Sequence, residues 1–237
     1  MMGNNTAIEK IRENERKSHV EMYSNDTLYK DGSWLKNPVK TVLELLTYFK
    51  DYTQLRVLDL GCGVGRNCIA IGQEFRSISC TIDCVDILDL AIDKLNEYAR
   101  EYDVSKSIHG IVQSIDEYPI PPNYYDWVIA VSALEHVNSE LTFVNKLKEI
   151  RSGIKDNGIV CLVINSSIQE FDKLTGNAVP AQFEVNFSTE ELQALLNDIF
   201  GNWNIMKSTV VKQRYDIPRE HGLSDLHTKV ITFVAKK

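Results

Sequence analysis

The stretch RVLDLGCGVGRN, from Arg56 to Asn67, constrains the fold more than any other part of the chain. Its first half is a short, mainly apolar run, as in a β-strand, and glycine then occupies positions 61, 63 and 65. Glycine allows backbone conformations that other residues avoid, and it lets a ligand approach the main chain closely. Because open α/β sheets bind ligands beyond the carboxyl ends of their strands, the stretch predicts a strand that ends in a binding loop.

Strand-like and helix-like segments alternate along the rest of the chain. Runs of apolar and β-branched residues predict strands, and apolar residues at helical spacing predict helices. Such alternation predicts a doubly wound, Rossmann-like α/β fold, in which a mostly parallel sheet of seven strands carries helices on both faces. The expected strands span residues 55–60, 78–85, 108–112, 124–133, 158–165, 203–211 and 228–235, and the expected helices span residues 66–75, 88–99 and 139–153 and begin again at Ser188.

The N-terminal part of the chain is expected to differ from the rest. Residues 1–54 are predicted to form a largely helical cap, and residues 55–237 a single structural unit. A helix is predicted to begin at Asn37-Pro38, because proline is favourable at the first helical position. The side chains expected to face the core are Val39, Val42, Leu43, Leu46 and Phe49.

Composition excludes several classes of protein. The chain has 237 residues, 43% of them apolar, and a net charge of -7, with no run of basic residues. This balance argues against a protein that grips nucleic acid mainly through its phosphates, so no nucleic-acid partner is expected. No stretch has the length and apolarity of a membrane span or a signal peptide, which favours a cytoplasmic protein with no membrane partner. The five cysteines include no Cys-x-x-Cys pair and are expected to be core residues rather than metal ligands.

The spacing of the glycines argues against two phosphate-binding loops. A dinucleotide fingerprint requires glycine at position 66, where the chain has Arg66, and a P-loop requires a Gly-Lys pair that does not follow. An NAD(P)-dependent oxidoreductase is therefore kept only as a minor alternative.

Glycines at 61, 63 and 65 after VLDL resemble motif I of the class I S-adenosylmethionine (SAM)-dependent methyltransferases. Two further segments, CVDILDLAIDKL and VQSIDEYPIPPNYYDWVIAVSALEHV, resemble the next parts of that family in the same order. The resemblance extends over Leu55 to Asn165. It implies SAM as the cofactor and S-adenosylhomocysteine as the product.

The same resemblance implies roles for individual residues. Asp86 is expected to accept the ribose hydroxyls, with Asp83 as the alternative, while Asp59 lies near the methionine end. Ser114 stands where an aspartate often binds the adenine, which leaves that role to the Ile115 backbone or to Asp116. The residues expected to bind the cofactor are Asp59, Gly61, Cys62, Gly63, Gly65, Asp86, Ile87, Ser114, Ile115 and Val131.

The methyl acceptor is less constrained. Leu134-Glu135-His136 resembles a Leu-Glu-His found in many small-molecule methyltransferases, so His136 is a candidate general base, with a structural loop histidine as the alternative. The flanks of the chain resemble the tellurite-resistance branch, in which histidine and arginine near the C-terminus lie close to the acceptor. Arg214, Arg219, His221 and His227 are the corresponding candidates, in a polar stretch over residues 212–229 that is either a functional loop or a solvated surface hairpin. Tyr23, Tyr29, Lys30 and Trp34 either line the acceptor pocket or pack the cap onto the sheet.

The leading hypothesis is thus a SAM-dependent methyltransferase of the general class EC 2.1.1.-. Its expected partner is a small-molecule acceptor, such as a thiol or a metalloid oxyanion. The alternatives are a methyltransferase acting on protein or RNA and a SAM-binding regulatory module without turnover. The sequence leaves the oligomeric state and the methylated atom open.

Overall fold

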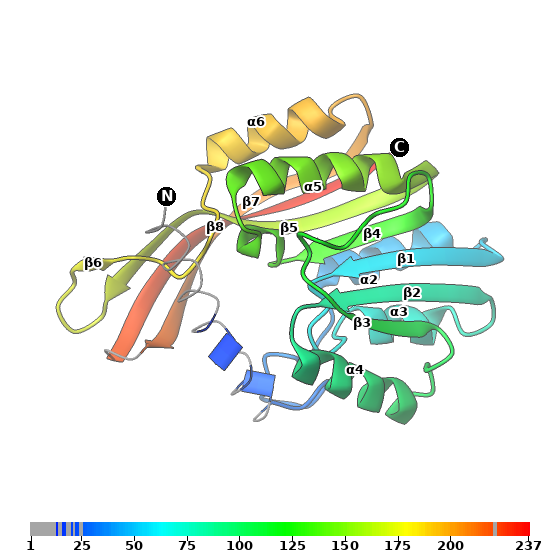
Figure 1. Cartoon of the computed structure of the whole chain (residues 1–237), viewed down its shortest axis with the longest axis horizontal. Helices are drawn as coiled ribbons and strands as arrows, with labels where there is room; N and C mark the ends of the chain where they lie inside the picture. Colours follow the sequence, from blue (N-terminus) through cyan, green and yellow to red (C-terminus); the bar gives the residue numbers. More distant parts are fainter. Residues whose placement is uncertain (1–12, 14–15, 18–19, 21, 24–25, 220–221) are drawn as a thin grey trace.

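The computed structural model describes residues 13, 16–17, 20, 22–23, 26–219 and 222–237. One sheet runs through this part of the chain, with the main strand order β3-β2-β1-β4-β5-β8-β7 (Figure 1). The strands are β1 (Gln54–Leu60), β2 (Ser79–Asp86), β3 (Ile108–Val112), β4 (Tyr125–Val131), β5 (Ile154–Asp172), β6 (Ala178–Val179), β7 (Asn204–Arg219) and β8 (Gly222–Lys236).

The sheet is parallel from β3 to β5 and antiparallel beyond it. β1 pairs with β2 and β4, β2 with β3, and β4 with β5, all parallel, whereas β8 is antiparallel to both β5 and β7. The prediction of a doubly wound, mostly parallel fold is confirmed, and all seven predicted strands are present. The two-residue β6 is an addition, paired with the end of β5.

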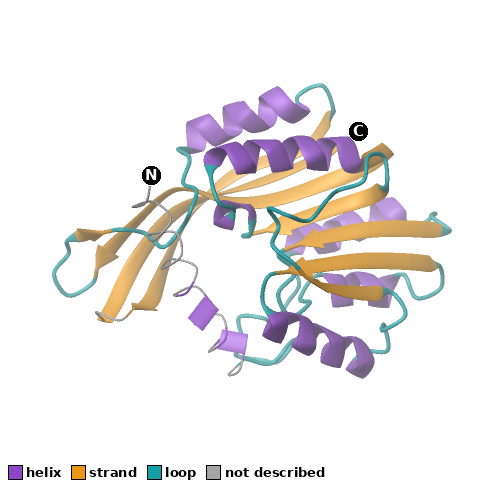
Figure 2. Cartoon of the chain, in the orientation of Figure 1, coloured by secondary structure: helices purple, strands orange, loops and turns teal. Residues whose placement is uncertain are grey.

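Helices cover both faces of the sheet (Figure 2). Apolar side chains of α2, α3 and α4 pack against one face, and those of α5 and α6 pack against the other. β4 lies between these layers and is buried over six consecutive residues, which explains its near-continuous apolar sequence. The helices are α2 (Lys40–Leu45), α3 (Cys68–Glu74), α4 (Asp89–Glu101), α5 (Glu140–Gly153) and α6 (Thr189–Phe200), with 3-10 turns at η1 (Leu46–Phe49) and η2 (Leu134–His136).

All five cysteines are buried and free, in agreement with their predicted role as core residues. Cys68, Cys84 and Cys161 have no exposed surface. Burial raises the pKa of the Cys161 thiol to about 12, so this side chain behaves as a small apolar group.

The segment before β1 is less helical than predicted over its described residues. α2 has only six residues, with Val39 rather than Asn37 as its N-cap, and continues as the 3-10 turn η1. The buried face of α2 consists of Thr41, Val42 and Leu45, and Leu43 is 40% exposed instead of facing the core as predicted. The segment is anchored to α3 by a hydrogen bond from the Val39 amide to Asn67 Oδ1 (3.0 Å). The proposed division of the chain at residues 54 and 55 stays a prediction.

The prediction of a loop over residues 212–229 is wrong for residues 212–219 and 222–229, which are paired strands, as the alternative of a surface hairpin expected. β7 and β8 remain in register to Arg219 and Gly222, and β5 runs on beside them to Asp172. We call this projecting part, formed by residues 165–172, 212–219 and 222–229, the ribbon (Figure 1). Its polar side chains, which suggested a loop, pair across strands. Arg219, for example, binds Glu170 through two hydrogen bonds of 2.8 and 3.0 Å, and the Glu170 side chain is 1% exposed.

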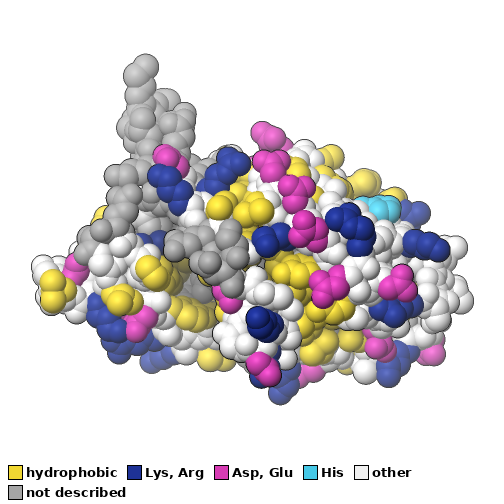
Figure 3. All heavy atoms as spheres, turned by 90° about the horizontal axis from the view of Figure 1, so that it is seen from below, with side chains coloured by type: hydrophobic (Ala, Val, Ile, Leu, Met, Phe, Trp, Pro, Cys, Tyr) yellow, Lys and Arg dark blue, Asp and Glu magenta, His cyan; other side chains and the backbone are white. Residues whose placement is uncertain are grey.

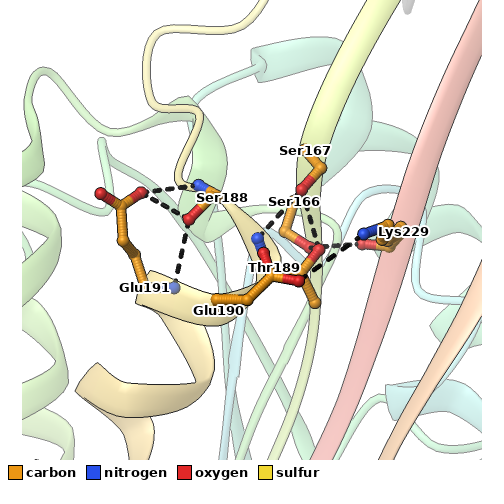
Figure 4. A network of polar contacts seen from close by, with 7 residues as sticks. All are labelled: Ser166, Ser167, Ser188, Thr189, Glu190, Glu191 and Lys229. Carbon is orange, nitrogen blue, oxygen red and sulfur yellow. Dashed lines mark hydrogen bonds and ion pairs between the residues drawn. The ribbon is translucent and has the colours of Figure 1, made fainter.

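The start of α6 is fastened to the ribbon (Figure 4). Ser188 and Glu191 form the predicted capping box. Thr189 Oγ1 lies 2.9 Å from both Ser166 Oγ and Ser167 Oγ, and Ser166 Oγ donates to the Lys229 carbonyl at 2.7 Å. These contacts hold the helix N-terminus against β5 and β8.

The surface carries charges of both signs. On the face seen in Figure 3, Lys and Arg side chains are interspersed with Asp and Glu, without a broad area of one sign. Within the described part of the chain, no helix has the length and apolarity needed to cross a membrane. In the same part, no group of three or more His, Cys, Asp or Glu side chains could hold a metal ion.

Candidate functional site

A cavity of about 460 Å³ lies at the carboxyl ends of the central parallel strands. Gly61 follows β1, Asp86 and Ile87 end β2, and Ala133 follows β4. β1 lies between β2 and β4, so this is the point where strand order reverses, the usual ligand position in such sheets. We call it the cofactor cavity, and its described lining residues are Glu13, Arg16, Tyr23, Gly61, Asp86, Ile87, Leu88, Ser114, Ile115, Asp116, Ser132, Ala133, His136 and Glu184.

Two glycines of the loop have conformations and surroundings that exclude a side chain. Gly61 has a φ of +71°, and a Cβ atom there would lie 2.3 Å from the Ala133 Cβ. Gly65 has a φ of +98°, and its Cβ would lie 2.5 Å from Leu95 Cδ1. Gly61 therefore keeps the cavity open, whereas Gly65 lets the loop pack against α4.

Asp86 connects the glycine loop to the end of β2. Its Oδ2 accepts a hydrogen bond from the Gly63 amide at 2.9 Å, and its Oδ1 accepts one from the Leu88 amide at 3.0 Å. The alternative acid, Asp83, accepts a hydrogen bond from the Tyr125 hydroxyl at 2.8 Å instead. Of the two carboxylates, only Asp86 lines the cavity.

Asp59 is a buried carboxylate beside the loop. The residue is only 1% exposed. Neither of its carboxylate oxygens has a hydrogen-bond partner within the part of the chain that the structure describes. Burial raises its pKa to about 7, with Asp86 adding to the rise and Arg66 opposing it. An unpaired buried carboxylate is unfavourable, and a cationic ligand group relieves that cost. The ammonium of a methionine moiety fits this requirement.

Asp59 is expected to make the stability of the ligand-free protein depend on pH. Because its pKa rises from 3.8 to about 7 on folding, the folded chain holds a proton that the unfolded chain releases. The free energy of unfolding should therefore fall as pH rises from about 4 to about 7, by about 4 kcal/mol. Urea denaturation of the wild type and of Asp59→Asn across this range measures the difference. If the free energy of unfolding changed with pH in the same way for both proteins, Asp59 would be ionised in the folded chain throughout this range.

His136 and Glu184 form a pair at the mouth of the cavity. His136 Nδ1 lies 3.0 Å from Glu184 Oε2, and the Glu184 side chain is 2% exposed. Phe183 stacks on the imidazole, with 5.0 Å between ring centroids. The backbone of this segment is fixed by a 3.0 Å hydrogen bond from the Val185 amide to the Glu135 carbonyl. A carboxylate at Nδ1 selects the imidazole tautomer whose Nε2 accepts a proton.

The structure brings together only part of the predicted set of site residues. Gly61, Asp86, Ile87, Ser114, Ile115 and His136 line the cavity, whereas Asp59, Cys62, Gly63, Gly65 and Val131 lie in the loop or strands behind it. Glu184, Ser132 and Ala133 are lining residues that the sequence did not indicate. Glu184 follows no periodic pattern and lies 48 positions from His136, so no sequence signal could have paired them.

Among the acceptor candidates, Tyr23 lines the cofactor cavity, whereas Tyr29, Trp34, Arg214 and His227 do not. The Tyr29 hydroxyl donates to the Arg66 carbonyl at 2.8 Å, and the Arg66 guanidinium lies 5.2 Å from the Trp34 ring centroid, so both aromatic residues pack the N-terminal segment onto α3. Arg214 and His227 line a second cavity, on the ribbon. Their role in acceptor binding stays a prediction, and His221 lies outside the described residues.

Solved structures with the same fold define the class of protein. TehB from Haemophilus influenzae matches 82% of this chain, over 61% of its own length, with 18% identity and a TM-score of 0.59. A SAM-dependent methyltransferase from Methanosarcina mazei matches 84% of this chain, over 98% of its own length, with 16% identity and a TM-score of 0.59. The fold is that of SAM-dependent methyltransferases.

Sequence comparison points to the same class of protein. Residues 57–158, less than half of the chain, match the family model described as a methyltransferase domain. Together with the shared fold, this match supports a SAM-dependent methyltransferase with SAM as its cofactor.

Two curated relatives match shorter regions. A tRNA N(3)-cytidine methyltransferase of Bos taurus is 27% identical over 110 residues, which cover 45% of this chain and 29% of the relative. An uncharacterized protein of Methanocaldococcus jannaschii is 28% identical over 122 residues, which cover 51% of this chain and 46% of the relative. The matched region thus spans less than half the length of either relative.

Proposed function

We propose that the protein transfers the methyl group of SAM to a small-molecule acceptor whose nucleophilic atom carries a proton. The observation that carries this proposal is the His136–Glu184 pair, whose two side chains line the same cavity as Gly61 and Asp86. A proton acceptor in that position serves a nucleophile that must lose a proton as it is methylated.

The residues in and beside the cavity have separate roles in the proposed reaction. When bound, SAM supplies a methyl group on a positively charged sulfur, which keeps the bonding electrons as the methyl group leaves. Asp86 holds the loop through Gly63 and accepts the ribose hydroxyls, and Asp59 pairs with the methionine ammonium. Nε2 of His136 takes the proton of the acceptor, and Glu184 stabilises the resulting imidazolium.

The size of the cavity supports a small acceptor. About 460 Å³ lies within the range of ordinary small-molecule sites, and the methyl-bearing end of the cofactor shares this space with the acceptor. Among the acceptors suggested by the flanks of the chain, a thiol fits His136 better than a metalloid oxyanion does, because a thiol must lose a proton to become a nucleophile.

An RNA acceptor is the second candidate, since one relative acts on tRNA. The net charge of -7 and the interspersed charges in Figure 3 argue against a broad RNA-binding face. A SAM-binding regulatory module is the third candidate, and it predicts binding without turnover. The cytoplasmic location stays a prediction from composition.

The test is S-adenosylhomocysteine release from SAM with a panel of thiols, amines, phenols, carboxylates, selenite, tellurite and an unmodified transfer RNA. Turnover with a protonated small acceptor, lost in His136→Ala, is the expected result. Turnover confined to the transfer RNA would replace the proposal by the second candidate. Tight SAM binding without turnover on any member of the panel would favour the third.

A further inference from the structure

The second cavity lies where the sheet emerges from under α6. Its volume is about 750 Å³. On β8, Ile231 and Phe233 pack under α6 in the core, and Lys229, two residues before Ile231 and on the same face, lines the cavity. Ser188, the N-cap of α6, lies at its border, held by the contacts of Figure 4. The second cavity thus continues the face of the sheet that α6 covers.

Strand register places four basic side chains on this one face. Lys212 lies directly opposite Lys229, and Arg214 lies directly opposite His227. Opposed residues of antiparallel strands point to the same side, as do residues two apart along a strand. The four therefore form a compact two-by-two group, which we call the basic quartet.

Only part of this positive charge is compensated. Arg214 binds Asp225 through two guanidinium nitrogens, and Lys229 Nζ lies 3.8 Å from Glu190 Oε1. Lys212 has no ion-pair partner in the described part of the chain, and none of the residues found to line the cavity is acidic. Like charges directly opposite each other are unfavourable, so the Lys212–Lys229 pair has a cost that a bound anion removes.

Neutral donors accompany the quartet. Gln169 lies opposite His227 on β5, and Asn186 is held against the bulge of β5 by hydrogen bonds of 2.9 Å to the Ile168 amide and carbonyl. The buried Nε2 of His227 lies 3.0 Å from Asp225 Oδ2 without an aligned hydrogen bond. Several fixed donors around clustered cations suit a group with several anionic oxygens.

The second cavity is joined to the cofactor cavity by one segment. Within residues 183–187, Glu184 lines the cofactor cavity, and Asn186 and Phe187 line the second. Hydrogen bonds also connect the ribbon to this segment through Glu135. Thr228 Oγ1 donates to Asn165 Oδ1 at 3.1 Å, and the Asn165 amide donates to Glu135 Oε1 at 3.2 Å. The Glu135 carbonyl in turn accepts from the Val185 amide. His136, paired with Glu184, lies on the cofactor-cavity side of this segment.

We propose that the basic quartet binds a phosphate group of the methyl acceptor while the nucleophilic end of that acceptor lies beside His136. This proposal rests on the proposed function and specifies its substrate class. The phosphate belongs either to a small phosphorylated compound or to the backbone of an RNA, and the two sources share the chemistry that the quartet recognises.

Isothermal titration of the full chain at low salt tests the proposal with two probes, inorganic phosphate and a single-stranded RNA pentanucleotide. The wild type should bind inorganic phosphate, and Lys212→Ala combined with Lys229→Ala should weaken this binding at least about tenfold, because two charge-assisted contacts are lost. The matched control is Lys50→Ala combined with Lys106→Ala, two exposed lysines at the opposite, N-terminal edge of the strands, which should change nothing. SAM affinity is measured in all three proteins and should be equal.

The outcomes separate the two proposals. Failure of the wild type to bind phosphate, or equal binding by the quartet variant, overturns the phosphate site even where SAM binding and turnover are normal. Absence of SAM binding by the wild type overturns the proposed function without bearing on phosphate. RNA that binds more than 100-fold tighter than phosphate, and loses that advantage in the quartet variant, assigns the phosphate to an RNA backbone. Similar affinities assign it to a small phosphorylated acceptor.

Discussion

Replacing Asp86 by alanine is expected to weaken SAM binding by at least about 100-fold. The carboxylate is the proposed acceptor for the ribose hydroxyls and also holds the Gly63 and Leu88 amides, so its removal should delete ligand contacts and release the loop. Isothermal titration with SAM and with S-adenosylhomocysteine measures the loss. The SAM affinity of Asp86→Asn should lie between those of the wild type and Asp86→Ala, since asparagine keeps one oxygen acceptor.

The control for Asp86→Ala is Asp93→Ala, which removes an exposed carboxylate from the neighbouring helix α4. Thermal unfolding of each variant establishes that the fold survives. An Asp86→Ala protein that is folded and binds SAM like the wild type would place the cofactor in another part of the molecule.

Replacing His136 by alanine should lower turnover by roughly 100- to 10,000-fold, the usual contribution of a general base. SAM affinity should change little, because Asp86 and the glycine loop remain. Glu184→Gln should give a smaller loss of kcat, since the imidazole stays in place but the developing imidazolium loses its counter-charge. The measurements are kcat and SAM affinity for each variant with the acceptor found in the panel.

Chemical rescue distinguishes catalysis from structure at this position. Free imidazole should restore part of the turnover of His136→Ala if the missing group is a base, and a purely structural loss would not respond. His109→Ala, which removes an exposed histidine from β3, is the matched control. If His136→Ala turned over substrate like the wild type, the imidazole would have a structural role, through its packing against Phe183.

The cofactor half of the site could be predicted because its information is local. The glycines and Asp59 lie within seven positions, and Asp86 follows at the end of the next strand, where a parallel sheet must bring it beside the loop. The choice between the two acids depended on a tertiary contact, because the Tyr125 hydroxyl donates to Asp83 from a strand that is not its neighbour, which favours Asp86 as the proposed ligand of the ribose.

The acceptor half could not be predicted, because its residues come together only through tertiary contacts. Glu184 has no pattern around it, and it lies beside His136 where the amide of the next residue, Val185, donates a hydrogen bond to the Glu135 carbonyl. The ribbon was left undecided between a loop and a surface hairpin for a different reason. Its charged residues have the composition of a surface loop, and pairs such as Arg219–Glu170 make that composition compatible with strands only after the strands have paired.

β5 carries residues of both cavities along a single strand. Val163 pairs with Val131, next to the cofactor cavity, and Gln169 pairs with His227 in the second cavity, six residues further along the same strand. An extended chain rises about 3.3 Å per residue, so the two cavities lie at most about 20 Å apart along one strand that bends at the bulge between Ser166 and Gln169. Under the proposal that both cavities bind one acceptor, this spacing should select acceptors by the distance between their anionic and nucleophilic ends.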